Sequence, residues 1–154
     1  MTGTHADELL ISDLGSVTRV RRDDVPIMYL DVAFDVEAIQ EGWPAFESRF
    51  TSLRGRTMMA VVFPERGIYR LATAMRDEDD PDALDLDMGA LPGGEYLLLR
   101  LDGPAPQVYR NIGPAFDELH RLAGRDRSRP AIELYRAPGQ VECLLPVEPA
   151  EQVS

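Results

Sequence analysis

The chain has 154 residues, a formal net charge of −11, 44% hydrophobic residues and 28% charged residues, values that fit one globular domain. The negative charge argues against a nucleic-acid-binding surface, because such a surface needs clustered basic side chains. All 16 basic residues are arginines, which excludes Schiff-base chemistry, pyridoxal phosphate enzymes and a Walker-type phosphate lysine.

The first half of the chain predicts strands around one helix. Residues 1–15 have no strong period and are expected to form a tail, whereas Val17–Arg22 and Val25–Phe34 are β-rich. Asp35 is a suitable N-cap for the helix that follows, which Pro44 is expected to kink or restart. The apolar face of this helix is spaced by three and four residues: Val36, Ile39, Trp43, Phe46, Phe50 and Leu53.

The rest of the chain reads in the same order. Thr57–Phe63 and Ile68–Met75 predict a hairpin that turns at Gly67, and an acidic segment, residues 76–90, predicts a solvated linker. A turn at residues 91–94 and a strand, Glu95–Leu101, then follow. The next helix has an apolar face of Val108, Ile112, Phe116, Leu119 and Leu122. A second hairpin, Pro130–Arg136 with Val141–Val147, turns at Gly139.

The order of these elements is repeated along the chain. Pro44-Ala45-Phe46-Glu47 and Pro114-Ala115-Phe116-Asp117 lie 70 residues apart, and each precedes two strands joined at a glycine. We therefore predict one βαββ unit written twice, in an α+β domain with a mostly antiparallel eight-stranded sheet and two main helices. The expected division is a tail (1–15), one domain (16–148) made of repeat 1 (17–75), the acidic linker (76–90) and repeat 2 (91–147), and a C-terminal tail (149–154).

The strand Ala131–Arg136 carries the main candidate for function. Its alternation places Glu133 and Tyr135 on one face and Ile132 and Leu134 on the other. A carboxylate beside aromatic rings suits a hydrophobic cation. Aligning the repeats through their turn glycines puts Val61 at the corresponding place, so the acid is present in one copy only. The alternative is a glutamate that faces water and pairs with an arginine.

Other kinds of site have little support. Two histidines and one cysteine, Cys143, do not favour zinc, and we expect neither a metal nor a cofactor. A single cysteine allows no internal disulfide and fits a reducing cytoplasm. The chain contains no apolar run long enough to span a membrane, so no membrane partner is expected. The oligomeric state is left open.

Several short motifs follow one another in a familiar order: Leu91-Pro92-Gly93-Gly94-Glu95-Tyr96, Gly103-Pro104, Ala115-Phe116-Asp117-Glu118-Leu119, Pro130-Ala131-Ile132-Glu133-Leu134-Tyr135 and Leu144-Leu145-Pro146-Val147. In this order and spacing the chain resembles the GyrI-like small-molecule-binding domains, which also occur as effector-binding domains of AraC-type and MerR-type transcription regulators. The resemblance covers about residues 17–147 and would make the chain a stand-alone form of the domain.

The resemblance implies a concave antiparallel sheet with a ligand cleft at the junction of the repeats. In relatives, a glutamate in the Glu-x-Tyr strand lies in that cleft among aromatic residues and meets lipophilic cations; this position matches Glu133, with Tyr135 beside it. Candidate walls are the remaining aromatic residues of the two copies: Trp43, Tyr29, Phe34, Tyr69, Tyr96 and Tyr109.

Three functions follow. The first is a sensor or sequestering protein that binds small hydrophobic, cationic compounds at Glu133. The second is a hydrolase of strained electrophilic molecules, in which Glu133 is the general base on a water and a tyrosine orients the substrate. The third is a protein-interaction inhibitor of the gyrase-inhibitor type, in which the acidic segment imitates a DNA backbone.

Overall fold

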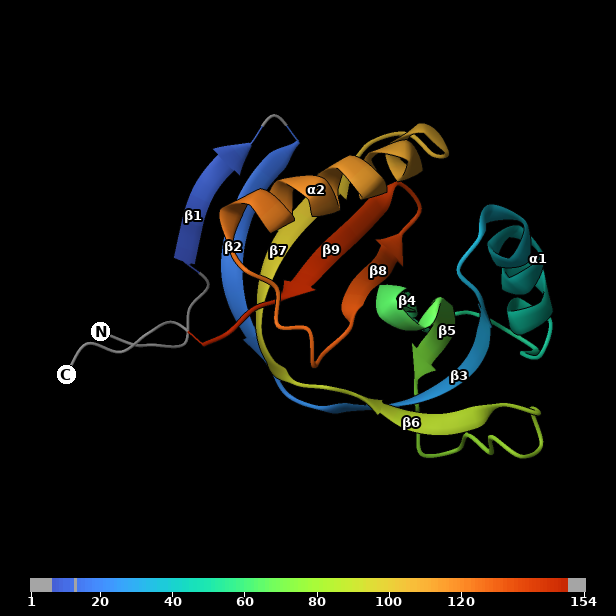
Figure 1. The fold of residues 1–154 in the computed structure, drawn as a ribbon. Helices are drawn as coiled ribbons and strands as arrows, with labels where there is room; N and C mark the ends of the chain where they lie inside the picture. Colours follow the sequence, from blue (N-terminus) through green and yellow to red (C-terminus); the bar gives the residue numbers. More distant parts are fainter. Residues whose placement is uncertain (1–6, 13, 150–154) are drawn as a thin grey trace.

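The computed structural model describes residues 7–12 and 14–149. In this part of the chain nine strands form one sheet in the order β1-β2-β7-β9-β8-β4-β5-β3-β6 (Figure 1). The strands are β1 (Asp7–Ser12), β2 (Gly15–Arg22), β3 (Val25–Ala33), β4 (Met58–Phe63), β5 (Ile68–Ala74), β6 (Asp87–Leu91), β7 (Gly94–Asp102), β8 (Ala131–Ala137) and β9 (Gln140–Pro146). The helices are α1 (Val36–Glu47), α2 (Ile112–Leu122) and the 3₁₀ segments Pro64–Arg66 and Gln107–Asn111.

The expected α+β class is confirmed, since every named strand pair is antiparallel and the sheet is combined with two α-helices. The units β3-α1-β4-β5 and β7-α2-β8-β9 share one order of elements. Outward from the central pair, the sheet reads β4-β5-β3 on one side and β8-β9-β7 on the other. The two units are therefore related by a pseudo-twofold axis between β4 and β8.

Two segments that we expected to lack regular structure form strands at the edges of the sheet. Part of the expected tail is β1, which pairs with β2, and the end of the expected linker is β6, which pairs with β3. Together with the seven strands whose ranges the sequence predicts, they make nine, one more than the expected eight. Antiparallel pairing forms hydrogen bonds between backbone groups whatever the side chains are. The side-chain composition of these segments therefore did not indicate that they pair.

Helix α1 begins where the sequence predicts. Asp35 is extended, and its Oδ1 accepts a hydrogen bond of 2.8 Å from the Ala38 amide, as an N-cap does. The helix continues past Pro44 and ends at Glu47, so Phe50 and Leu53 belong to the loop that follows rather than to the helix face. None of the helices in the described residues is long and apolar enough to span a membrane.

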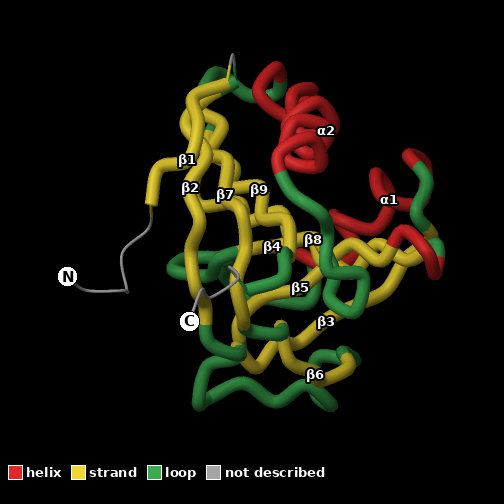
Figure 2. Tube along the Cα trace, turned by 60° about the vertical axis from the view of Figure 1, so that its left-hand side comes forward, coloured by secondary structure: helices red, strands yellow, loops and turns green. Residues whose placement is uncertain are grey.

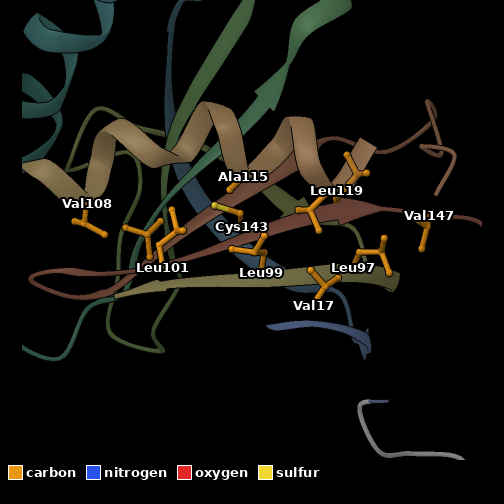
Figure 3. Close-up of a cluster of buried hydrophobic side chains, with 11 residues drawn as sticks. Val17, Leu97, Leu99, Leu101, Val108, Ala115, Leu119, Cys143 and Val147 are labelled. Atoms are coloured by element: carbon orange, nitrogen blue, oxygen red, sulfur yellow. The ribbon is translucent and has the colours of Figure 1, made fainter. Parts of the chain in front are cut away.

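Both α-helices cover the same face of the sheet (Figure 2). Helix α2 packs on β7 and β9, where Ala115 and Leu119 meet Leu99 and Cys143 in a buried cluster (Figure 3). Helix α1 packs on β3 and β5 through Phe46. The central strands β4 and β8 are thus left between the two helices.

The opposite face of the sheet is buried without a helix. Its cluster unites Ile27 of β3 and Leu91 of β6, at one end of the sheet order, with Tyr96 of β7 near the other end, and includes Ile132 from the centre. These residues can meet only because the sheet curls on itself. This second core holds the central strands from behind and leaves the helix-covered face free to carry a site.

The alignment of Glu133 with Val61 is wrong by one residue. Glu133 pairs directly with Ala60, whereas Val61 pairs with Ile132 and packs on the opposite face. The two hairpins turn differently: β4 and β5 are joined through a 3₁₀ segment, while β8 and β9 have a shorter turn and a bulge between Tyr135 and Ala137. Matching the turn glycines therefore shifts the register.

Candidate functional site

Glu133 lies at the centre of a row of paired residues that crosses the sheet. From β7 to β5 the row is Leu99, Cys143, Glu133, Ala60 and Leu71. Residues paired in this way share a face, which here is the face that carries both helices. Glu133 is the polar member of this row, and only 8% of its surface is exposed. A buried acid in the middle of an apolar row is costly unless it has a function or a partner.

The partners of Glu133 are two tyrosines. The Tyr69 hydroxyl donates to Glu133 Oε1 over 2.8 Å, and the Tyr135 hydroxyl donates to the same atom over 2.5 Å. Among the described residues, no arginine forms an ion pair with Glu133, and its Oε2 makes no hydrogen bond. The water-facing, arginine-paired alternative is therefore not what the structure has.

Burial sets the titration of this group. Desolvation raises the pKa of Glu133 above its usual value of 4.5, while the hydrogen bonds from Tyr135 and Tyr69 work in the opposite direction. Desolvation and the nearby Glu133 charge raise the pKa of both tyrosines far above their usual value of 10.0. The two phenols thus stay protonated and serve as fixed donors, and the carboxyl group is the one that can change charge.

A cleft of about 820 Å³ opens in front of the two tyrosines, between α1, the β8–β9 turn and the Gln107–Asn111 segment. Its size falls in the range of small-molecule sites. We call it the aromatic cleft, after the rings of Trp43, Tyr69, Tyr109 and Tyr135. The other lining residues are Ile39, Gln40, Glu47, Leu53, Arg56, Met58, Arg136, Ala137 and Pro138.

Edge contacts hold the rings in place. Trp43 and Tyr109 both meet Tyr135 edge-on, with ring centroids 5.6 Å and 6.0 Å away. Phe34 stacks on Tyr69 with centroids 6.2 Å apart. Such contacts fix orientation beyond what area burial does. Tyr135 thus joins the carboxylate, through its hydroxyl, to the aromatic wall, through its ring.

Two of the three charged residues that line the cleft, Arg56 and Arg136, are paired with acidic side chains. Arg56 forms a bidentate pair with Asp79, and the Arg136 Nε donates to Glu142 Oε1 over 3.0 Å. Glu47 of α1 has neither a hydrogen bond nor an ion pair from its side chain within the described part of the chain. The unpaired charges on the cleft are therefore negative, which favours a cation.

The eight residues expected at the site divide into three groups. Tyr135, Trp43, Tyr69 and Tyr109 line the cleft. Glu133 is not part of the lining but is hydrogen-bonded to Tyr69 and Tyr135, and Phe34 stacks on Tyr69. Tyr29 and Tyr96 lie on the opposite face. Tyr29 packs there under Arg70, whose guanidinium carbon is 3.7 Å from the ring centroid, and the buried Tyr96 donates to the Pro92 carbonyl.

Sequence reasoning missed the apolar and charged lining, of which Ile39, Leu53 and Met58 form the apolar part. Ile39 had a usable signal, since it shares the helix face of Trp43. Nothing in the sequence marks Arg56 as a cleft residue. No group of three or more histidine, cysteine or acidic side chains is placed to hold a metal within the described residues.

The raised pKa of Glu133 gives a testable stability effect. An acid whose pKa is raised by folding stabilises the folded state below the unfolded value of 4.5, and this contribution is lost as the pH rises through the folded pKa. Glu133→Gln removes the group that titrates. We expect the variant to gain stability over the wild type at about pH 8 and to gain much less at about pH 4.

Urea unfolding of both proteins across this range measures the difference. Other titrating groups are common to the two proteins and cancel in the comparison. A difference in stability that is constant with pH would contradict a raised pKa at Glu133.

The fold recurs in solved structures. A protein designated SAV2435, in complex with tetraphenylphosphonium, matches with a TM-score of 0.59 and 15% identity over 86% of this chain and 93% of that one. An integron cassette protein from Vibrio cholerae matches with a TM-score of 0.62 and 14% identity over 86% and 95%. A hydrolase from Listeria innocua matches with a TM-score of 0.52 and 11% identity over 86% and 91%.

At identities this low, the structural similarity shows a shared fold and nothing more. The sequence itself matches no protein-family model and no curated protein.

Proposed function

We propose that this protein binds small hydrophobic cations in the aromatic cleft, with Glu133 as the counter-charge, and that it acts as a sensor or sequestering protein. One observation carries the proposal. Within the described residues, a buried carboxylate has only neutral tyrosines as hydrogen-bond partners, and these two tyrosines line a cleft walled by aromatic rings. A charge in that setting lacks the opposite charge that would offset its desolvation.

A hydrophobic cation supplies what the site lacks. Its charge favours the ionised form of Glu133, and the faces of Trp43 and Tyr109 attract positive charge while its apolar body fills the cleft. Because Glu133 must give up its proton when the cation binds, affinity should increase with pH until the free site is fully ionised. An anion would meet the same carboxylate at unfavourable energy.

One neighbour in fold supports this chemical class. SAV2435 is bound to tetraphenylphosphonium, a lipophilic cation. We further propose that the chain is a GyrI-like domain. Two observations support this: the shared fold, and the Glu133-Leu134-Tyr135 strand, whose acid and phenol lie together at the junction of the repeats.

The single tryptophan of the chain gives a direct test. Trp43 lies in the wall of the cleft, so intrinsic tryptophan fluorescence reports on that site alone. We expect tetraphenylphosphonium to change this fluorescence saturably. N-acetyltryptophanamide, titrated in the same way, controls for absorption and collisional quenching. A linear change equal to that of the control would contradict binding in the cleft.

A second candidate function is hydrolysis of a strained electrophile. The observation that favours it is Glu133 Oε2, which has no hydrogen-bond partner among the described residues and is free to accept a proton from water. The resulting hydroxide would attack the electrophilic carbon, and the ring bond would break onto its heteroatom, which the proton then neutralises. Epoxide opening that is lost in Glu133→Gln would favour the enzyme; binding without turnover would favour the first proposal.

A further inference from the structure

A second cavity, of about 440 Å³, lies beside the loop that follows α1. It gathers four arginines in a chain whose net charge is −11. We call it the basic cavity. Its charged and hydroxyl lining consists of Arg49, Arg54, Arg56, Arg76, Thr51, Ser52, Glu78, Asp79 and Asp80, and its apolar lining includes Phe50 and Leu84.

The loop is shaped to bring these arginines together. Gly55 has a φ of +75°, which side chains other than glycine rarely adopt, and a Cβ at this position would lie 3.1 Å from a terminal nitrogen of Arg76. Arg76 can therefore pack against the loop, where its Nη2 donates to the Arg54 carbonyl over 2.9 Å. The arginine from the acidic segment thus joins those of the loop.

One of the four guanidinium groups is neutralised. Arg56 is buried, and both of its terminal nitrogens donate to Asp79, which holds the pKa of that carboxyl below its usual value. The Arg56 Nε is also buried and has no hydrogen-bond partner within the described residues. Arg56 therefore fixes the back of the cavity, and its charge is offset by that of Asp79.

The other three arginines have no close acidic partner, although Arg49 and Arg76 each donate one hydrogen bond to a backbone carbonyl, of Ala45 and Arg54 respectively. Arg49 and Arg76 approach Asp85 and Glu78 only to 3.9 Å, beyond hydrogen-bond distance, and these acids are 97% and 69% exposed. The Arg54 guanidinium makes no hydrogen bond or ion pair in the part of the chain that the structure describes. Exposed pairs of this kind contribute little. Three guanidinium groups thus have donors to spare at one cavity.

We propose that the basic cavity binds a small phosphorylated molecule. Guanidinium groups match phosphate oxygens bidentately, and several around one site are best satisfied by a tetrahedral dianion. Thr51 and Ser52 add hydroxyl donors; the Ser52 Oγ accepts from the Arg54 amide and keeps its own proton to donate. The volume exceeds that of a phosphate group alone, and Phe50 and Leu84 provide an apolar wall for the remainder of the molecule.

This site is separate from the aromatic cleft, although Arg56 lines both. Arg54 lines the basic cavity and not the cleft, so Arg54→Ala tests the anion site without disturbing the residues proposed for cation binding. Arg21→Ala is the matched control. Arg21 is an exposed arginine of β2, in the other half of the sheet, that approaches Glu95 only to 3.9 Å, and its loss changes the net charge equally.

The experiment follows backbone amide shifts of residues 49–56 by NMR while inorganic phosphate or ribose 5-phosphate is added, with sodium chloride at equal ionic strength as the reference. We expect saturable shifts with both phosphates, tighter binding of ribose 5-phosphate, and a loss of about fivefold or more in affinity in Arg54→Ala but not in Arg21→Ala. Shifts that chloride reproduces, or equal losses in the two variants, would overturn the proposal.

Discussion

Glu133→Gln is expected to weaken binding of tetraphenylphosphonium by at least about tenfold, which corresponds to about 1.4 kcal/mol. Glutamine keeps the shape of the side chain and leaves an oxygen to accept from Tyr69 and Tyr135, so the wall of the cleft is preserved. What is lost is the negative charge. The charge acts in a buried setting where solvent screens it poorly. Its removal should therefore cost more binding affinity than the removal of a surface acid.

The matched control is Glu41→Gln. Glu41 is exposed on α1, the helix that supplies Trp43 to the wall, but it does not line the cleft. The two variants make the same chemical change and the same change in net charge. Titrations that follow Trp43 fluorescence should give an affinity for Glu41→Gln within about twofold of the wild type. Equal losses in both variants would mean that overall charge, rather than Glu133, attracts the cation.

Phe46→Ala is expected to lower the free energy of unfolding by about 3–5 kcal/mol, the usual cost of emptying a buried phenylalanine site. Phe46 has no exposed surface and joins α1 to the sheet in the cluster that contains Ala60 and Leu71. Its ring also meets Trp43 edge-on, with centroids 6.3 Å apart. The substitution should therefore loosen the wall of the cleft as well as the core.

Urea unfolding followed by circular dichroism measures this loss. Phe34→Ala is the control, because Phe34 precedes α1 and is 48% exposed; it should cost less than about 1 kcal/mol. A loss in Phe46→Ala that is no larger than the loss in Phe34→Ala would show that α1 is not anchored through this ring.

Much of the fold could be predicted from the sequence because helices and strands leave local patterns of apolar residues. The spacing of Ile39, Trp43 and Phe46 marks α1, and alternation along β8 separates Glu133 from Ile132. The repeat of Pro-Ala-Phe led to two units and a junction between them. The edge strands could not be predicted, since their pairing depends on backbone hydrogen bonds with β2 and β3 rather than on their own side chains.

The site could be predicted only where its residues are close in the sequence. Tyr135 lies two residues from Glu133 on one strand, and alternation places them together. Tyr69 is 64 residues away, and its role depends on how β5, β4 and β8 pair. The register also decides which aromatic residues face the cleft, so Tyr29 and Tyr96 could not be separated from Tyr69 by composition. A bulge in the second hairpin shifted the match for Glu133 from Ala60 to Val61.

Arg56 illustrates what pattern reading leaves out. The acidic segment reads as a solvated run, yet Asp79 within it is buried and holds Arg56 at a position that lines both the aromatic cleft and the basic cavity. A run of charged residues is usually solvated, and no local pattern distinguishes Asp79, the acid that packs against the protein, from its neighbours.

The central claim, that Glu133 provides the counter-charge of the cleft, is tested most directly with two ligands of one shape and opposite charge. Tetraphenylphosphonium and tetraphenylborate are titrated against the wild type and Glu133→Gln. The wild type should strongly prefer the cation, and this preference should fall by about tenfold or more in the variant, because only the charge of residue 133 differs between the two proteins. A ratio of affinities that is the same in both proteins would contradict the claim.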